Sequence, residues 1–195
     1  MSTINYEKNE VQCKVVYCGT KFSGKTTNLR EIHYRTMDAR RTELLGGTEL
    51  CRTLGFEYLS YYQIGALKLR VTLCTVPGLV DERASRKSAL RDVDGIIFVA
   101  DSDSSRSGDN IVALAEMIED LEEYRAAMSD IPWVLQYNKR DLESAMPLDR
   151  MERELNQGRV RSIEACAAEG FGVWTSLNTV LSKLYARFSG RKVDP

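Results

Sequence analysis

The stretch from Gly19 to Thr27 constrains the fold most, because it sets two glycines, a lysine and a threonine at fixed spacing. Its sequence, GTKFSGKTT, fits the pattern G-x-x-x-x-G-K-[ST]. An apolar run at residues 11–18 predicts a strand before it, and residues 26 to about 37 are compatible with a helix after it. A loop in this context turns successive backbone N–H groups toward one anion, and the positive end of the following helix adds its dipole. The pattern therefore predicts a P-loop for a nucleoside triphosphate, with these residues around the phosphates: Gly19, Thr20, Lys21, Phe22, Ser23, Gly24, Lys25, Thr26 and Thr27.

Two of these side chains carry the expected chemistry. Lys25 is a point charge that can reach the terminal phosphates, and we interpret it as a catalytic as well as a binding residue. The Thr26 hydroxyl can ligate a Mg²⁺ ion that bridges those phosphates. The P-loop by itself leaves the base and the reaction open.

The rest of the hydrophobic pattern predicts an α/β fold. Continuous apolar runs at 95–100 and 131–135 indicate strands buried on both faces, the second extending to residue 137. Strict alternation at 67–76 indicates a strand with one exposed face, joined to a strand at 56–62. Helical spacing at 111–121 and 173–188 predicts two helices, and a third, short helix is predicted near 148–155. A strand is predicted near 160–165 and a loop at 38–50. Alternating helices and strands predict a doubly wound sheet, with the ligand at the carboxyl ends of its strands.

Composition excludes several classes of partner. The 27 basic and 28 acidic residues nearly cancel, so nothing global draws the chain to nucleic acid. The five cysteines are odd in number and form no C-x-x-C pair, which favours reduced thiols over disulfides or a zinc site. We find no membrane-spanning run, signal peptide or lipidation motif. We therefore expect a cytoplasmic protein without a stable membrane anchor.

A second motif identifies the base. Asn138-Lys139-Arg140-Asp141 follows the buried strand at 131–137 and fits N-K-x-D, the guanine-reading motif of GTPases. The Asp141 carboxylate can accept hydrogen bonds from guanine N1–H and N2–H₂ together, a donor pair that adenine lacks. Asn138 can tie its loop to the P-loop, and the stem of Lys139 can lie over the ring. This motif, downstream of a P-loop, favours GTP and GDP over adenine nucleotides.

At this point the chain resembles the Ras-like small GTPases over essentially its whole length, and within them the bacterial MglA branch of gliding-motility and cell-polarity proteins. The residues that carry the resemblance are Glu49 to Leu54, Thr75 to Gly78, Ala84 to Lys87, Val93 to Gly95 with Phe98 to Ser102, and Gln136 to Asp141. The resemblance implies one small-GTPase domain over residues 1–195. It also implies a P-loop NTPase fold with a mostly parallel six-stranded sheet and an edge β-hairpin.

The resemblance also assigns roles. Thr53 matches the threonine that ligates Mg²⁺ and senses the γ-phosphate, and Arg52 matches an intrinsic arginine finger. Thr75 stands where most small GTPases carry an aspartate near the metal, and the Gly78 amide matches a γ-phosphate contact. Residues 164–167 resemble the fifth GTPase motif, with Cys166 in the usual serine position and the Ala167 amide expected to contact the guanine carbonyl.

Two departures bear on hydrolysis. Leu79 stands where the family has a glutamine that orients the attacking water, and leucine has no hydrogen-bonding group for that task. Lys21 replaces a usual glycine and projects toward the γ-phosphate, where it could obstruct catalysis or add positive charge. Either turnover is slow or absent, or Leu79 packs in the folded switch and a partner supplies the water-positioning group.

Three functions follow as alternatives. The first is a GTP-dependent switch, formally a GTPase, which the resemblance pairs with a roadblock-fold activating protein of the MglB type and with effectors. These partners could recruit it to a cell pole or a membrane-associated complex. The second is a GTP-bound interaction module that does not hydrolyse its nucleotide. The third, a small-molecule P-loop kinase, is disfavoured by the N-K-x-D motif and by the lack of an obvious lid segment.

Overall fold

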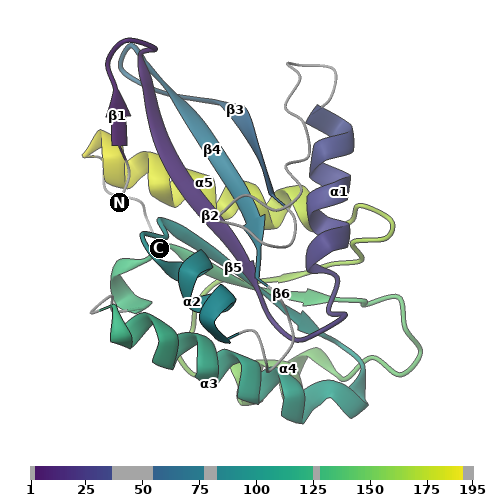
Figure 1. Cartoon of the computed structure of the whole chain (residues 1–195). Helices are drawn as coiled ribbons and strands as arrows, with labels where there is room; N and C mark the ends of the chain where they lie inside the picture. The colour runs from purple at the N-terminus through teal and green to yellow at the C-terminus, as the bar shows by residue number, and fades with distance from the viewer. Residues whose placement is uncertain (1–2, 37–54, 77–82, 125–127, 191–195) are drawn as a thin grey trace.

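The computed structural model describes residues 3–36, 55–76, 83–124 and 128–190 of the 195. Strands and helices alternate along these residues (Figure 1). The strands are β1 (Thr3–Asn5), β2 (Glu10–Cys18), β3 (Gly55–Ile64), β4 (Leu67–Thr75), β5 (Gly95–Asp101), β6 (Trp133–Asn138) and β7 (Ser162–Glu164). The helices are α1 (Lys25–Thr36), α2 (Arg83–Leu90), α3 (Ser107–Glu123), α4 (Leu148–Leu155) and α5 (Val173–Ser189), with short 3₁₀ turns η2 (Ser104–Arg106) and η3 (Met128–Asp130).

The strands form one mixed sheet in the order β3-β4-β2-β5-β6-β7. From β4 to β7 every neighbouring pair is parallel, whereas β3 pairs antiparallel with β4 and forms the outer strand of an edge hairpin. The short strand β1 adds an antiparallel partner to β2. After β2 the chain first adds β3 and β4 on one side of it, and then β5, β6 and β7 on the other side. The strand order therefore reverses between β2 and β5, and α/β proteins bind ligands at the carboxyl ends of the strands at such a switch point.

Helices bury both faces of this sheet in separate hydrophobic cores. On one face, α1 and α5 pack through residues such as Leu29, Ile32 and Leu177 against β2 and β4. On the other face, α2, α3 and α4 contribute residues such as Leu90 and Met117. Burial on two faces explains why β5 is apolar up to its last residue, Asp101, since all seven of its residues are buried.

The predicted doubly wound α/β fold with an edge hairpin is confirmed, and several boundaries shift. The predicted strand at 131–137 begins later, at Trp133, because Pro132 has no N–H for the ladder and contributes only its carbonyl, which accepts from the Ile96 amide at 3.0 Å. The strand predicted near 160–165 shortens to β7. The hydrophobic pattern did not predict β1 or α2. The loop predicted at 38–50 lies outside the described residues.

The structure also bears on the state of the cysteines and on membrane-spanning helices. The described cysteines, Cys13, Cys18, Cys74 and Cys166, are buried and free of disulfides. Among the helices that the structure describes, none has both the length and the apolar character needed to cross a membrane.

Candidate functional site

The P-loop connects the end of β2 to the start of α1, and its two glycines hold conformations that other residues resist. Gly19 has φ +128°, and a Cβ there would lie 2.1 Å from the Val99 carbonyl oxygen. Gly24 has φ +101°, and a Cβ there would lie 2.1 Å from Asn138 Nδ2. The first glycine therefore lets the loop lie against β5, and the second lets it lie against the end of β6.

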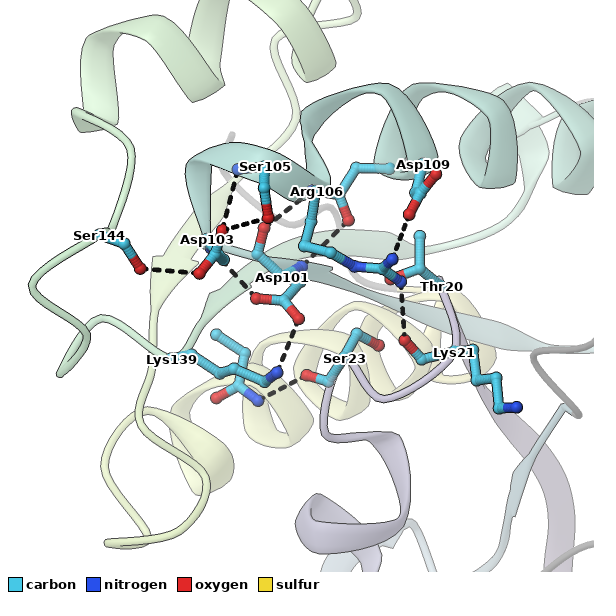
Figure 2. A network of polar contacts seen from close by, with 12 residues as sticks. Thr20, Lys21, Ser23, Asp101, Asp103, Ser105, Arg106, Asp109, Lys139 and Ser144 are labelled. Atoms are coloured by element: carbon cyan, nitrogen blue, oxygen red, sulfur yellow. Dashed lines mark hydrogen bonds and ion pairs between the residues drawn. The ribbon is translucent and has the colours of Figure 1, made fainter.

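The carbonyl groups of the P-loop are held by side chains from three elements. Lys25 Nζ donates to the carbonyls of Gly19 (2.9 Å) and Thr20 (2.5 Å). Arg106 Nη2 donates to the Lys21 carbonyl at 3.1 Å (Figure 2). Asn138 Nδ2 donates to the Ser23 carbonyl at 2.7 Å. In a planar trans peptide the N–H points opposite to the carbonyl. The contacts at Lys21 and Ser23 thus turn the amide groups that follow them away from Arg106 and Asn138.

Lys25 lies in an environment that suits an anion. Its side chain is 7% exposed, and burial lowers its pKa to about 8. Within the described residues the ammonium makes no ion pair, only its two carbonyl contacts. The first turn of α1 carries no acidic side chain, so the positive end of the helix dipole is not neutralised there.

Two hydroxyls beside this lysine support the same fit. Thr20 Oγ1 and Ser23 Oγ are buried and have no hydrogen-bond partner among the described residues. Buried polar groups without partners are costly in proteins, and phosphate oxygens are acceptors that both hydroxyls could reach from this loop. The donor groups of the P-loop are therefore of the kind that a phosphate group needs.

The other predicted phosphate and metal residues occupy different surroundings. Thr26 and Thr27 are exposed in the first turn of α1, and Thr75 is buried at the end of β4, where the next amide bonds to the Tyr17 carbonyl at 3.1 Å. Phe22 is 76% exposed at φ +64°, with Lys21 Nζ 4.8 Å from its ring centroid. Predictions on Arg52, Thr53, Gly78 and Leu79 fall outside the described residues.

Asn138 connects the P-loop to the two loops predicted to bind guanine. It is 2% exposed, and while its Nδ2 donates to Ser23, its Oδ1 accepts from the Ala167 amide at 2.8 Å. One amide side chain thus joins the ends of β2, β6 and β7. The Ala167 amide, predicted to contact guanine, is engaged with Asn138 in this structure.

Asp141 is exposed at the rim of the same loop. The Cys166 thiol donates a hydrogen bond to its carboxylate, and this contact lowers the pKa of Asp141 below its usual value. Burial and the neighbouring carboxylate raise the pKa of Cys166. The thiol therefore supplies the donor that a serine hydroxyl would supply, and Asp141 stays ionised at neutral pH.

Sequence reasoning missed a set of supporting residues at the end of β5. Lys139 Nζ forms an ion pair with Asp101 Oδ2 at 2.7 Å, and the Asp103 carboxylate accepts from Ser144 Oγ at 2.7 Å (Figure 2). Arg106 follows in η2 and reaches the P-loop. The available signal was the abrupt change from a buried apolar strand to a cluster of charged residues at its carboxyl end.

This arrangement defines a P-loop nucleotide-binding protein, because the loop lies at the switch point of a parallel sheet and a buried asparagine joins it to an N-K-x-D loop. The model of the ADP-ribosylation factor family matches residues 1–184. The chain is also 42% identical over 183 residues to the mutual gliding-motility protein MglA of Myxococcus xanthus (strain DK1622), covering 92% of this chain and 94% of that protein. The chain therefore belongs to the Arf/Ras-like small GTPases, a family of guanine-nucleotide-binding GTP hydrolases.

Proposed function

We propose that this chain is a GTP-dependent switch of the MglA type, acting in bacterial motility and cell polarity as one domain over residues 1–195. The observation that carries the proposal is the contact of Asn138 with both the P-loop and the loop at Ala167. A single buried side chain thereby couples a phosphate-binding loop to a base-binding loop. The relative at 42% identity is named for gliding motility, which supports the cellular role.

The P-loop residues are proposed to bind the phosphates of GTP or GDP. Lys25 would exchange its carbonyl contacts for phosphate oxygens, an exchange that its burial and lowered pKa favour because an anion stabilises the charged form. Backbone amides along residues 19–27 would supply the remaining donors. A bound Mg²⁺ would neutralise phosphate charge, with Thr26 and Thr53 as its protein ligands and Thr75 beside a metal-bound water.

Asp141 is proposed to bind the guanine base through its carboxylate, and the stem of Lys139 to pack along the ring. The loop at Cys166 and Ala167 is proposed to contact the same base. The Cys166 thiol lowers the pKa of Asp141, so this carboxylate would be charged when it accepts from guanine. Because the Ala167 amide already donates to Asn138 at 2.8 Å, a contact with the guanine carbonyl would be shared rather than separate.

Hydrolysis is proposed to depend on Arg52 as an internal arginine finger and on the Gly78 amide. Leu79 removes the usual water-orienting glutamine, so intrinsic turnover is expected to be slow unless a partner supplies that group. The second candidate, a GTP-bound interaction module, is favoured by Leu79 and by the lysine at position 21 of the P-loop.

The proposed partners are an activating protein of the roadblock fold, of the MglB type, and motility or polarity effectors. Through them a cytoplasmic protein would reach a cell pole or a membrane-associated complex. Neither nucleic acid nor a stable membrane anchor belongs to this proposal.

The first experiment measures displacement of a fluorescent GDP analogue from the purified protein by GTP, GDP and ATP. We expect GTP and GDP to compete and ATP to fail; equal competition by ATP would overturn the guanine assignment. Single-turnover hydrolysis of loaded GTP, with and without a roadblock-fold partner, then separates the two candidates. GDP formation in either condition supports a cycling switch, and GTP that persists in both supports the interaction module.

A further inference from the structure

We propose that Asp101 is a positioning residue for guanine-nucleotide binding, because its buried carboxylate fixes Lys139 in the N-K-x-D loop. The ion pair between Asp101 Oδ2 and Lys139 Nζ, at 2.7 Å, carries the inference. This inference rests on the proposed function and deepens it, since it adds a residue from β5 to the base-binding loop that β6 presents.

Hydrogen bonds fix both the side chain and the backbone of Asp101. The residue is 2% exposed, and its Oδ1 accepts from the Asp103 amide at 3.1 Å. Its backbone is clamped by buried Asn110 of α3, whose Oδ1 accepts from the Asp101 amide (3.0 Å) and whose Nδ2 donates to the Asp101 carbonyl (2.8 Å). A buried carboxylate fixed in this way presents a charge at a defined place, and it is tolerated because each oxygen has a partner.

The register between β5 and β6 places Lys139 beside the Asp101 carboxylate. Asp101 pairs with Asn138 in the parallel register of β5 and β6, and the Ser102 amide donates to the Asn138 carbonyl at 2.9 Å. Lys139 follows directly, with φ +66°, a conformation that non-glycine residues seldom adopt. The left-handed turn sends its side chain back across the end of β5, where Figure 2 shows the ammonium meeting the Asp101 carboxylate.

The neighbouring carboxylate is engaged elsewhere. Asp103 accepts from Ser144 Oγ (2.7 Å) and from both the amide and the hydroxyl of Ser105 (2.9 and 2.5 Å). Among the described residues Asp101 is thus the ion-pair partner of Lys139. An ammonium anchored at one end immobilises the four-carbon stem before nucleotide arrives, which reduces the ordering cost when a base packs along that stem.

A double-mutant cycle tests the proposal, with Asp101→Asn, Lys139→Gln and the double variant. The measurement is the dissociation constant of a fluorescent GDP analogue, which avoids hydrolysis, together with the urea midpoint of each nucleotide-free protein. We expect Asp101→Asn to weaken GDP binding about tenfold and to add almost nothing once Lys139 is already Gln. A purely structural role would instead lower the urea midpoint and weaken binding to the same extent in both backgrounds, which would overturn the proposal.

The matched control is Asp149→Asn on α4, which removes an exposed carboxylate paired with Arg153 at 3.3 Å and leaves GDP affinity unchanged. If Asp101→Asn cannot be purified, Lys139→Arg replaces it. Retaining a cation opposite Asp101 is expected to preserve most of the affinity that Lys139→Gln loses, and equal losses would refute the role of the pair. Failure of the unmodified protein to bind GDP would instead count against the proposed function.

Discussion

Replacing Asn138 with alanine removes a side chain that joins the P-loop to both proposed base-binding loops. The truncation deletes two hydrogen bonds, of 2.7 Å to the Ser23 carbonyl and 2.8 Å from the Ala167 amide. The site is 2% exposed, so water does not readily replace the lost partners. Each buried polar group left without a partner costs about 1–3 kcal/mol, so the two together should lower the free energy of unfolding by about 2–6 kcal/mol.

That loss is large against the roughly 5–15 kcal/mol by which natural domains are stable. The assay is urea denaturation of the nucleotide-free protein, followed by the same titration with saturating GDP. A ligand that binds only the folded state stabilises it by an amount that grows with ligand concentration relative to its dissociation constant. We therefore expect Asn138→Ala to lower the urea midpoint and also to shrink the additional stabilisation that GDP provides.

A second asparagine provides the control. Asn156 follows α4 away from this site and makes comparable bonds, its Nδ2 to the Val160 carbonyl and its Oδ1 from the Val160 amide, both at 2.8 Å. Asn156→Ala should lose stability but keep the full GDP-induced shift. If Asn138→Ala also keeps the full shift, the asparagine serves the fold alone and the reasoning about the site is wrong.

Three further predictions concern the base, the phosphates and hydrolysis. Asp141→Asn should abolish the preference for guanine over other bases in nucleotide competition, and an unchanged preference for GTP would contradict its assignment. Burial lowers the pKa of Lys25 from 10.5 to about 8, so the unfolded state binds more protons between these two pH values. The free energy of unfolding of the nucleotide-free protein, measured by urea denaturation, should therefore rise with pH across this window. Lys25→Met should lack that rise. Leu79→Gln should raise single-turnover GTP hydrolysis if the missing glutamine limits the rate, and a flat rate would point to Lys21 or to a required partner.

The elements that sequence predicted best are those with strong local signals. The strand before the P-loop, the two-face-buried β5 and the long α5 each repeat their pattern over many residues, and the fold they predict is confirmed. The helix α2 was missed because its sequence, RASRKSAL, is mostly polar and buries only Ala89 and Leu90. Besides these two core residues, ion pairs hold the helix, such as Arg86 Nε with the buried Asp120 at 2.5 Å.

The supporting network of the site was beyond sequence reasoning for a different reason. Asp101 and Lys139 are separated by 38 residues, and their contact depends on the register between β5 and β6. Arg106 reaches the Lys21 carbonyl across 85 residues. Periodicity reports which side chains share a face, and the motifs predicted that the Asn138 loop meets the P-loop. Neither gives the strand register that pairs individual side chains such as Asp101 and Lys139.

These long-range contacts also explain how the P-loop accommodates a lysine at position 21. Arg106 binds the backbone carbonyl of Lys21, a contact that any residue at this position can make. Lys21 does not have a positive φ, so the fold requires no glycine there, in contrast to Gly19 and Gly24. The lysine therefore leaves the shape of the loop intact, and what distinguishes it from glycine is a cation beside the proposed phosphate site. Any functional consequence of Lys21 must then act through charge and bulk near the phosphates rather than through distortion of the loop.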